Sequence, residues 1–372
     1  MSAHVLHICC NLAGSTVFSQ MFEALRDAGL AQTVFVPEKR AQNMNRNVPR
    51  GVPTHYARTV RTSDMLFFPM KARRTVPVIR QTVDCAGVTL IHAHTLFTDG
   101  SIARRLSAQT GIPYMVTLRY SDIEAIWKYE PHLRPMARRI LRGAQAIVFL
   151  SDVSREKVLR GWFRAGEGAA LRSRTAVIPN GIDPAWLDGH ARRAPGGPVR
   201  VGFAGLFNDR KRPLDALSAV RAAQAAGDRR YVLHACGSGP LEAKLRAAMQ
   251  PEDRFAGRVQ GMEAMKAFYA DCDVLLVPSS AETFGMVYLE AMSQGVPVLY
   301  TRGQGFDGQF PEGEVGYSVV CGDVAQQAKR LGDVLQDYEA RSARCVARAA
   351  AYAWPEIAKR WMALYQAAPD AR

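Results

Sequence analysis

Two acidic residues, Glu282 and Glu290, stand on either side of a Phe-Gly pair in the stretch SSAETFGMVYLEAMSQGVPVL (residues 279–299). The preceding apolar run DVLLVPS predicts a strand, and the apolar pattern after the Phe-Gly pair predicts a helix. The amides between the two acids then lie at a helix N-terminus, where unpaired N–H groups and the helix dipole favour an anion. We expect a phosphate site at the amides of Thr283, Phe284, Gly285, Met286 and Val287.

The two carboxylates indicate what else the ligand carries. A carboxylate beside bound phosphate is unfavourable unless it is used, and its natural partners are hydroxyl groups, which sugars supply. A phosphate flanked by two acids therefore suggests a nucleotide-sugar. In the alternative interpretation, Glu282 caps the helix and Glu290 is merely exposed.

Short apolar strands with helical spacers must position this turn. Their alternation is typical of βαβ units in a parallel, doubly wound α/β sheet, where ligands bind beyond the carboxyl ends of the strands. The predicted strands of the first half are residues 4–10, 32–37, 88–94, 113–118, 146–151 and 175–181. Those of the second half are residues 199–205, 231–237, 273–279 and 297–301.

A chain of 372 residues is long for one hydrophobic core. Between residues 188 and 199, the sequence DGHARRAPGGPV loses its periodicity and collects Gly, Pro and Arg, which predicts a domain boundary. We therefore expect one α/β domain over residues 1–187 and a second over 188–353. The last stretch, AWPEIAKRWMALYQAA, has the pattern of an amphipathic helix.

The opening segment resembles the E-x7-E signature of family 4 glycosyltransferases, and further motifs extend the resemblance over most of the chain. These motifs are HICCNLAGS, VTLIHAHTLFTDG, AIVFLSDVSREKVL, AVIPNGID, VGFAGLFNDRKRP, ACGSGPLEAKL and AWPEIAKRWMALY. The resemblance implies the GT-B fold, in which two Rossmann-like domains face each other across a cleft. It also implies that a C-terminal helix, residues 354–372, crosses back to the N-terminal domain.

The resemblance further assigns roles to individual residues. Glu282 matches the acid that contacts the hydroxyls of the donor sugar, and Glu290 matches the acid that holds the ribose. Arg210 and Lys211 match a basic pair that neutralises the donor diphosphate and stabilises the leaving group, as preorganised cations do. The remaining donor-binding residues implied are Gly14, Gly237, Phe284, Gly285, Met286 and Val287.

Two positions depart from the family pattern. Arg119 stands in VTLRYSD where many members carry a His, and an arginine cannot act as a general base. It is expected either to bind the donor sugar or an acidic acceptor, or to be charge-paired with Asp122. Leu206 occupies a position where many members have Arg, so Arg210 would have to substitute for that cation. His94, at the carboxyl end of its strand, is expected near the acceptor.

No metal or cofactor is expected. Asp271 and Asp273 have the D-x-D spacing of a metal site in another glycosyltransferase fold, but they open a strand directly before VLLVPS. His92 and His94 face one side of a strand, yet a zinc site needs a third ligand that is not apparent in the sequence. The seven cysteines form no C-x-x-C arrangement, which favours reduced thiols.

The charge of the chain is uneven. Its net charge is +14, and residues 1–180 hold 25 Lys and Arg against 12 Asp and Glu. This surplus suggests an anionic partner. The stretch MLFFPMKARRTVPVIR (65–80) interleaves apolar and basic residues and is expected either to lie on a membrane surface or to be a helix with a basic outer face. No nucleic-acid-binding motif accompanies the charge.

These observations favour a retaining, metal-independent hexosyltransferase. It would move a hexose or N-acetylhexosamine from a UDP- or GDP-sugar to a glycan, lipid-linked or other cell-envelope or secondary-metabolite acceptor. The alternatives are a non-catalytic GT-B subunit that binds nucleotide-sugar, and a GT-B phosphorylase or epimerase. Without an apolar run of about 20 residues or a leader pattern at its start, the chain is expected in the cytoplasm, peripherally at a membrane if its acceptor is lipid-linked.

Overall fold

A computed structural model describes residues 3–39, 47–61, 64, 68–227, 229–282 and 284–367. The chain forms two compact units. Unit 1 consists of Met1–Gly181 and Trp354–Arg372, and unit 2 of Ile182–Ala353. The division falls after residue 181, whereas the loss of periodicity placed it after residue 187, because Ile182 already pairs with Ala353 of unit 2.

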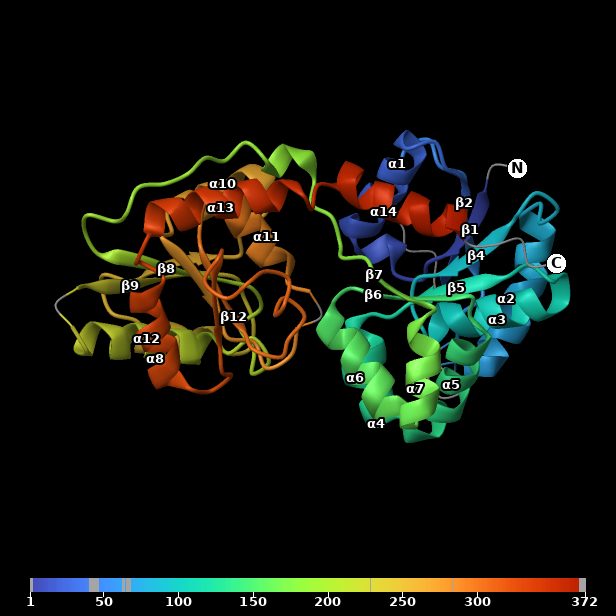
Figure 1. The fold of residues 1–372 in the computed structure, drawn as a ribbon, viewed down its shortest axis with the longest axis horizontal. Coiled ribbons are helices and arrows are strands. Elements are labelled where there is room, and N and C mark those ends of the chain that lie inside the picture. Colours follow the sequence, from blue (N-terminus) through green and yellow to red (C-terminus); the bar gives the residue numbers. More distant parts are fainter. Residues whose placement is uncertain are drawn as a thin grey trace. The chain divides into compact units, whose positions relative to one another are not determined.

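Unit 1 is built on a sheet of seven parallel strands in the order β3-β2-β1-β4-β5-β6-β7 (Figure 1). The strands are β1 (His4–Ile8), β2 (Ala31–Glu38), β3 (Thr54–Arg58), β4 (Leu90–Ala93), β5 (Tyr114–Thr117), β6 (Ala146–Phe149) and β7 (Thr175–Val177). Strands β4 and β5 are buried throughout and β1 is buried after its first residue, as expected where helices cover both faces of a parallel sheet.

Helices cover both faces of this sheet, with α1 and α14 side by side on one of them (Figure 1). The helices of unit 1 are α1 (Thr16–Asp27), α2 (Phe68–Thr82), α3 (Thr98–Thr110), α4 (Trp127–Tyr129), α5 (Arg134–Gly143), α6 (Asp152–Trp162), α7 (Ala165–Arg172) and α14 (Trp354–Ala367). Among the helices that the structure describes, none is long and apolar enough to cross a membrane.

Helix α14 comes from the far end of the sequence and completes the core of unit 1. Its Trp361 is 1% exposed and packs on the ring of His92, with centroids 5.0 Å apart. The indole N–H of Trp354 donates to Gln20 of α1 (3.1 Å), and the ring of Trp354 lies so close to Gly181 that a Cβ there would come within 2.5 Å of it. The terminal helix therefore belongs to unit 1, as the family resemblance implied.

Unit 2 repeats the architecture with six parallel strands in the order β10-β9-β8-β11-β12-β13. The strands are β8 (Val199–Ala204), β9 (Tyr231–Cys236), β10 (Arg254–Gly257), β11 (Val274–Val277), β12 (Val298–Thr301) and β13 (Gly316–Val319). The helices are α8 (Pro213–Ala225), α9 (Glu242–Ala248), α10 (Met262–Ala270), α11 (Met286–Ser293), α12 (Val324–Asp333) and α13 (Tyr338–Ala350). The predicted fold of two Rossmann-like domains is confirmed.

Replacing Trp361 with alanine is expected to destabilise unit 1 by about 3–5 kcal/mol, because the change leaves a large cavity beneath α14. Urea unfolding of the full chain would measure the effect. The neighbouring, exposed Arg360 supplies the control, and R360A should shift stability by no more than about 0.5 kcal/mol. Equal effects of the two substitutions would show that α14 does not form part of the core.

Candidate functional site

In unit 2, two loops at the carboxyl ends of adjacent strands bind each other. The first follows β8 and carries Arg210, and the second follows β11. The main-chain N–H of Ser280 donates to the carbonyl oxygen of Arg210 (2.8 Å), and the Arg210 guanidinium donates to the carbonyl oxygen of Ala281 (3.4 Å). The structure therefore brings together the two segments to which the sequence assigned the donor phosphates.

Lys211 and Glu282 join the same loops by an ion pair. Their side chains are only 12% and 13% exposed. The main chain fixes both ends, because the N–H of Lys211 donates to Asn208 Oδ1 (2.9 Å) and the N–H of Glu282 donates to Gln304 Oε1 (2.9 Å). The pair holds a cation and a hydrogen-bond acceptor side by side, which is what a sugar diphosphate requires.

The turn between the two acids has the predicted strand-to-helix form. Gly285 has a φ of +85°, and a Cβ there would approach the ring of Tyr288 to 2.5 Å, so only glycine fits this position. Helix α11 begins at Met286 and points its N-terminus to the turn, with Val287 in its first turn. Phe284 is buried against Phe306 and Tyr352, and these contacts anchor the loop. Thr283 lies outside the described residues.

Glu290 lies in the second turn of α11 and is held by a neighbour. The hydroxyl of Tyr269, from α10, donates to its carboxylate (2.9 Å). Burial raises the pKa of Glu290, and the Tyr269 hydrogen bond opposes that rise. The charge of Glu290 also acts on Cys236, which precedes Gly237 at the end of β9. Glu290 is thus neither a cap nor a solvated surface residue.

Gly237 has a structural reason to be glycine. A Cβ there would lie 1.8 Å from the carbonyl oxygen of Gly205, in the loop after β8. The two loops approach this closely because Phe207 N–H donates to the carbonyl oxygen of Ser238 (2.9 Å). Leu206, where the family pattern has a cation, is 53% exposed. Gly14 of unit 1 is exposed, and a Cβ there would meet nothing within 4 Å.

Arg119, in unit 1, is paired differently from the expectation. Its main-chain N–H, not its guanidinium, donates to Asp122 (2.9 Å). The guanidinium donates to Asn180 Oδ1 (2.8 Å) and to the carbonyl oxygen of His94 (3.4 Å), and it lies over the ring of Phe18. Burial lowers the pKa of Arg119 to about 10, so the side chain stays charged at neutral pH.

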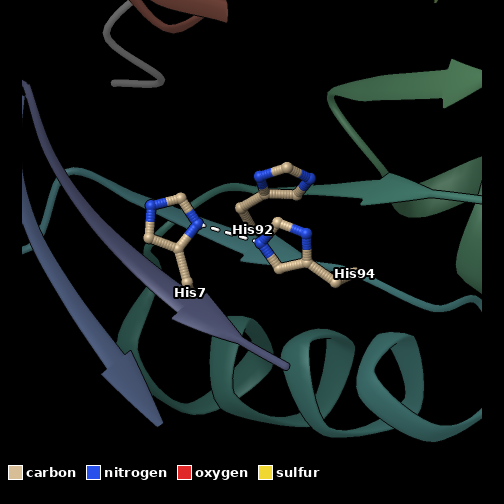
Figure 2. Close-up of side chains that lie close together, drawn as sticks. All are labelled: His7, His92 and His94. Carbon is tan, nitrogen blue, oxygen red and sulfur yellow. Dashed lines mark hydrogen bonds between the residues drawn. The ribbon is translucent and has the colours of Figure 1, made fainter. Parts of the chain in front are cut away.

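His94 belongs to a buried histidine cluster, defined by His7, His92 and His94 (Figure 2). His7 of β1 pairs in register with His92 of β4, and its Nδ1 lies 3.0 Å from His94 Nε2. All three side chains are fully buried. The acceptor contact predicted for His94 stays a prediction, and the structure places this ring in the core, against Phe18 and Phe22 of α1. The sequence also missed His7 as a third member of the cluster.

One ring nitrogen of each histidine lies within 4.8 Å of those of the other two, and hydrogen bonds use several of the ring nitrogens. Both ring nitrogens of His92 are in use, at 2.8 Å from Tyr365 Oη and 2.8 Å from Thr117 Oγ1. The rings of His92 and His94 are tilted, with centroids 4.0 Å apart and 36° between their planes. Among the described residues, His7 Nε2 and His94 Nδ1 are buried without a hydrogen-bond partner.

The carboxylates of Asp271 and Asp273 form ion pairs with arginine side chains. Arg200 contacts both carboxylates, Asp271 at 2.8 Å and Asp273 at 2.7 Å. Asp271 also pairs with Arg254. These acids compensate neighbouring cations, and that use accounts for the D-x-D spacing without a metal ion.

Unit 1 contains a pocket of about 870 Å³ at the carboxyl ends of β1 and β2. Lys71, in the first turn of α2, lines it and is only 4% exposed, yet within the described residues its ammonium makes no hydrogen bond or ion pair. The buried carboxyl group of Asp99 lies within electrostatic range, and burial raises its pKa to about 7, opposed by Lys71. Other residues lining the pocket are Cys10, Glu38, Lys39, Arg61 and Thr98.

This position of Lys71 changes the interpretation of the basic segment 65–80. Lys71 faces the pocket instead of an outer surface, and Arg74 pairs with the buried Asp64. Only Arg73 and Arg80 of its four predicted cations are exposed. Residues 65–67, and the side chains of 68 and 69, lie outside the described part of the chain.

Two family models match the chain over nearly all of its folded length. "Glycosyl transferase 4-like domain" matches residues 13–181, and "Glycosyl transferases group 1" matches residues 190–351. The chain belongs to the family 4-like glycosyltransferases with a GT-B fold. Among curated relatives, it is 29% identical over 266 residues to "D-inositol 3-phosphate glycosyltransferase" of Corynebacterium urealyticum, covering 64% of this chain and 61% of that relative.

Solved structures of similar fold span the whole chain. Sucrose-phosphate synthase from Thermosynechococcus elongatus has a TM-score of 0.76 and 19% identity, covering 98% of each chain. HepE from Anabaena, solved in complex with UDP, has a TM-score of 0.73 and 17% identity, covering 98% of this chain and 100% of that one. At these identities the similarity establishes the fold.

The histidine cluster predicts a pH-dependent stability of unit 1. Burial lowers the pKa of His7 to about 3 and lowers those of His92 and His94 below 6.5. The unfolded chain therefore binds more protons below pH 6.5, and each histidine that stays neutral removes about 1.4 kcal/mol of stability per pH unit as the pH falls. Asp99 and Asp122, with pKa values raised to about 7 and 6, act in the opposite sense.

A comparison of variants isolates the histidine contribution. Between pH 6.5 and 4.5, H94Q should reduce the pH slope of the unfolding free energy by about 1.4 kcal/mol per pH unit. H132Q, which changes a half-exposed histidine of the same unit, should leave the slope unchanged. Identical slopes for wild type and H94Q would contradict a neutral, buried His94.

Proposed function

We propose that this chain is a retaining, metal-independent glycosyltransferase that moves a hexose or N-acetylhexosamine from a UDP- or GDP-sugar to an anionic acceptor. The observation that carries the proposal is the ion pair between Lys211 and Glu282 beside the N-terminus of α11. It places a phosphate-binding cation and a hydroxyl-binding carboxylate at one point. Neither a simple helix cap nor a surface salt bridge would need side chains this deeply buried.

The donor would bind along the loops of unit 2. Its diphosphate would lie between the first turn of α11 and the Arg210-Lys211 segment, where helix amides and cations both favour negative charge. Glu282 would accept hydrogen bonds from the sugar hydroxyls. Glu290, already oriented by Tyr269, would accept those of the ribose. HepE, solved with UDP, supports a uridine nucleotide as the first donor to test.

In the transfer step, Arg210 and Lys211 would stabilise the leaving group, which is the nucleoside diphosphate. The bond between the anomeric carbon and the distal phosphate oxygen breaks, the acceptor oxygen bonds to that carbon on the same face, and the acceptor proton passes to the departing phosphate. Negative charge grows on that phosphate as the bond breaks, and Arg210 and Lys211 would offset it. No side chain needs to act as a general base, which is compatible with Arg119 in place of a histidine.

The acceptor would occupy the pocket of unit 1. Lys71 is nearly buried and makes no hydrogen bond or ion pair within the described residues, although its charge acts on Asp64 and Asp99, so an anionic ligand would stabilise it further. The pocket also has Arg61 and Lys39 on its wall. We therefore expect an acceptor that carries a phosphate or carboxylate beside its hydroxyl groups. A relative named for inositol 3-phosphate supports this class.

The donor assignment predicts that Glu290 contributes mainly to donor binding and Lys211 mainly to turnover. E290Q should weaken UDP or GDP binding at least tenfold in a thermal-shift or calorimetric titration, because an amide accepts fewer ribose hydrogen bonds than a carboxylate. K211A should lower kcat by about 100-fold or more while changing donor affinity less. K244A, an exposed lysine of unit 2, is the control and should alter neither.

Two results would contradict this assignment. One is the reverse ranking, with turnover lost in E290Q and binding lost in K211A. The other is donor binding by the wild type without transfer to any of a broad panel of acceptors, which would favour a non-catalytic nucleotide-sugar-binding subunit. Sugar phosphates or epimers formed without an acceptor would instead identify a phosphorylase or epimerase.

The acceptor assignment predicts an effect on KM. With a phosphorylated polyol acceptor, K71M should raise the acceptor KM at least tenfold and leave the donor KM within about threefold, because one buried charge contact is lost. R73A removes an exposed cation of the same helix and should change neither constant. If neutral and phosphorylated acceptors are used equally well by the wild type, the anionic acceptor class is wrong.

A further inference from the structure

A second basic pocket, of about 510 Å³, lies in unit 1 between α5 and the segment that joins α6 to α7. Three arginines line it, and an indole and a phenyl ring form its apolar part. We call it the arginine groove, defined by Arg138, Arg142, Trp162, Phe163, Arg164 and Glu167. Nothing in the donor or acceptor assignments uses these residues.

The groove carries a surplus of positive charge. Its one acid, Glu167, is bound by Arg142 through two hydrogen bonds of 2.5 and 3.2 Å. The hydrogen bond from Arg142, with the nearby charges of Arg138 and Arg164, lowers the pKa of Glu167 and keeps it ionised. The three arginines thus outnumber the acids among the groove residues by two, and within the described residues Arg164 makes no hydrogen bond or ion pair.

Arg138 is held in place before any ligand binds. Its Nε donates to the carbonyl oxygen of Trp162 (2.7 Å), and its guanidinium lies 5.4 Å from the ring of Trp127. The two indoles stack with centroids 3.8 Å apart and 8° between their planes. The terminal Nη atoms of Arg138 bond no other described residue. A fixed guanidinium with free terminal nitrogens can bind an oxyanion in two-point fashion at little entropic cost.

The arginine groove and the acceptor pocket lie near opposite ends of the parallel strands. Arg142 is near the end of α5, which leads into the start of β6, and Phe163 and Arg164 follow the end of α6. Both places are near the amino ends of the strands. The acceptor pocket is at the carboxyl ends of β1 and β2, where ligands of such sheets react. An anion in the groove would therefore not be the acceptor group undergoing transfer.

We propose that the arginine groove is a separate binding site for a phosphate group, held by Arg138 and Arg164 over the Trp127–Trp162 stack. A phosphate monoester or diester has the charge and the paired oxygens that a guanidinium recognises. The same chemistry is offered by the headgroup of an anionic lipid and by a soluble phosphate compound. Trp162 and Phe163, which are 3% and 9% exposed, form the floor of the groove beneath such a group.

The test uses the full chain with substitutions R138A and R164A together, and R164A alone. Vesicles of phosphatidylcholine, with and without phosphatidylglycerol, probe the lipid source by co-sedimentation. Glycerol 3-phosphate probes the soluble source by tryptophan fluorescence, since Trp162 lines the groove and Trp127 stacks on it. The matched control is R73A with R80A, which removes two exposed cations from α2 of the same unit.

We expect the double groove variant to weaken binding of the responsible probe at least tenfold, the R164A variant to weaken it about threefold or more, and the control to change it less than threefold. Loss confined to anionic vesicles identifies a lipid headgroup, and loss with glycerol 3-phosphate identifies a soluble phosphate. Equal losses in the groove variants and the control would reduce the effect to net charge and overturn the proposal. Absence of binding to both probes by the wild type would also overturn it.

Discussion

The ion pair between Lys211 and Glu282 joins loops that are 71 residues apart in sequence, and it holds the loops after β8 and β11 together. Each side chain is largely withdrawn from water, so removing one partner would leave a poorly solvated charge and cost about 3–5 kcal/mol. The pair can form because β8 and β11 are neighbours in the sheet, which brings their carboxyl-end loops together. Sheet order thus sets the distance between cation and carboxylate before any ligand arrives.

Much of this arrangement could be predicted from the sequence. The buried strands are continuous apolar runs, and the Phe-Gly turn marks the start of α11. The local sequence pattern was therefore sufficient to predict these elements. The strands β3, β10 and β13 were not predicted. β3 and β10 are edge strands that are only partly buried, and β3 reads THYAR and β10 reads RFAG, with no apolar run to detect. The pairing of Arg119 with Asn180 was not predictable either, since those residues are 61 positions apart.

The histidine cluster shows what sequence spacing leaves out. The i, i+2 spacing of His92 and His94 correctly indicated one face of a strand, but the third ring, His7, lies on a neighbouring strand. Parallel register and the cover of α14 bury all three. Burial in turn keeps the rings neutral, and hydrogen bonds to Tyr365 and Thr117 satisfy both ring nitrogens of His92. The cluster therefore contributes to the core of unit 1.

The basic surplus of the first half does not by itself locate an anionic partner. Charges on a surface are screened over about 8 Å at physiological salt, so a distributed surplus attracts anions weakly and without preference for one place. The position of each cation decides whether it has a partner. Arg172 pairs with Glu156 and Arg74 with Asp64, whereas in the part of the chain that the structure describes Lys71 and Arg138 form no ion pair. Those two lie in separate pockets, near opposite ends of the parallel strands. An anion bound at one of them would therefore not compete with an anion bound at the other, as the two proposed sites require.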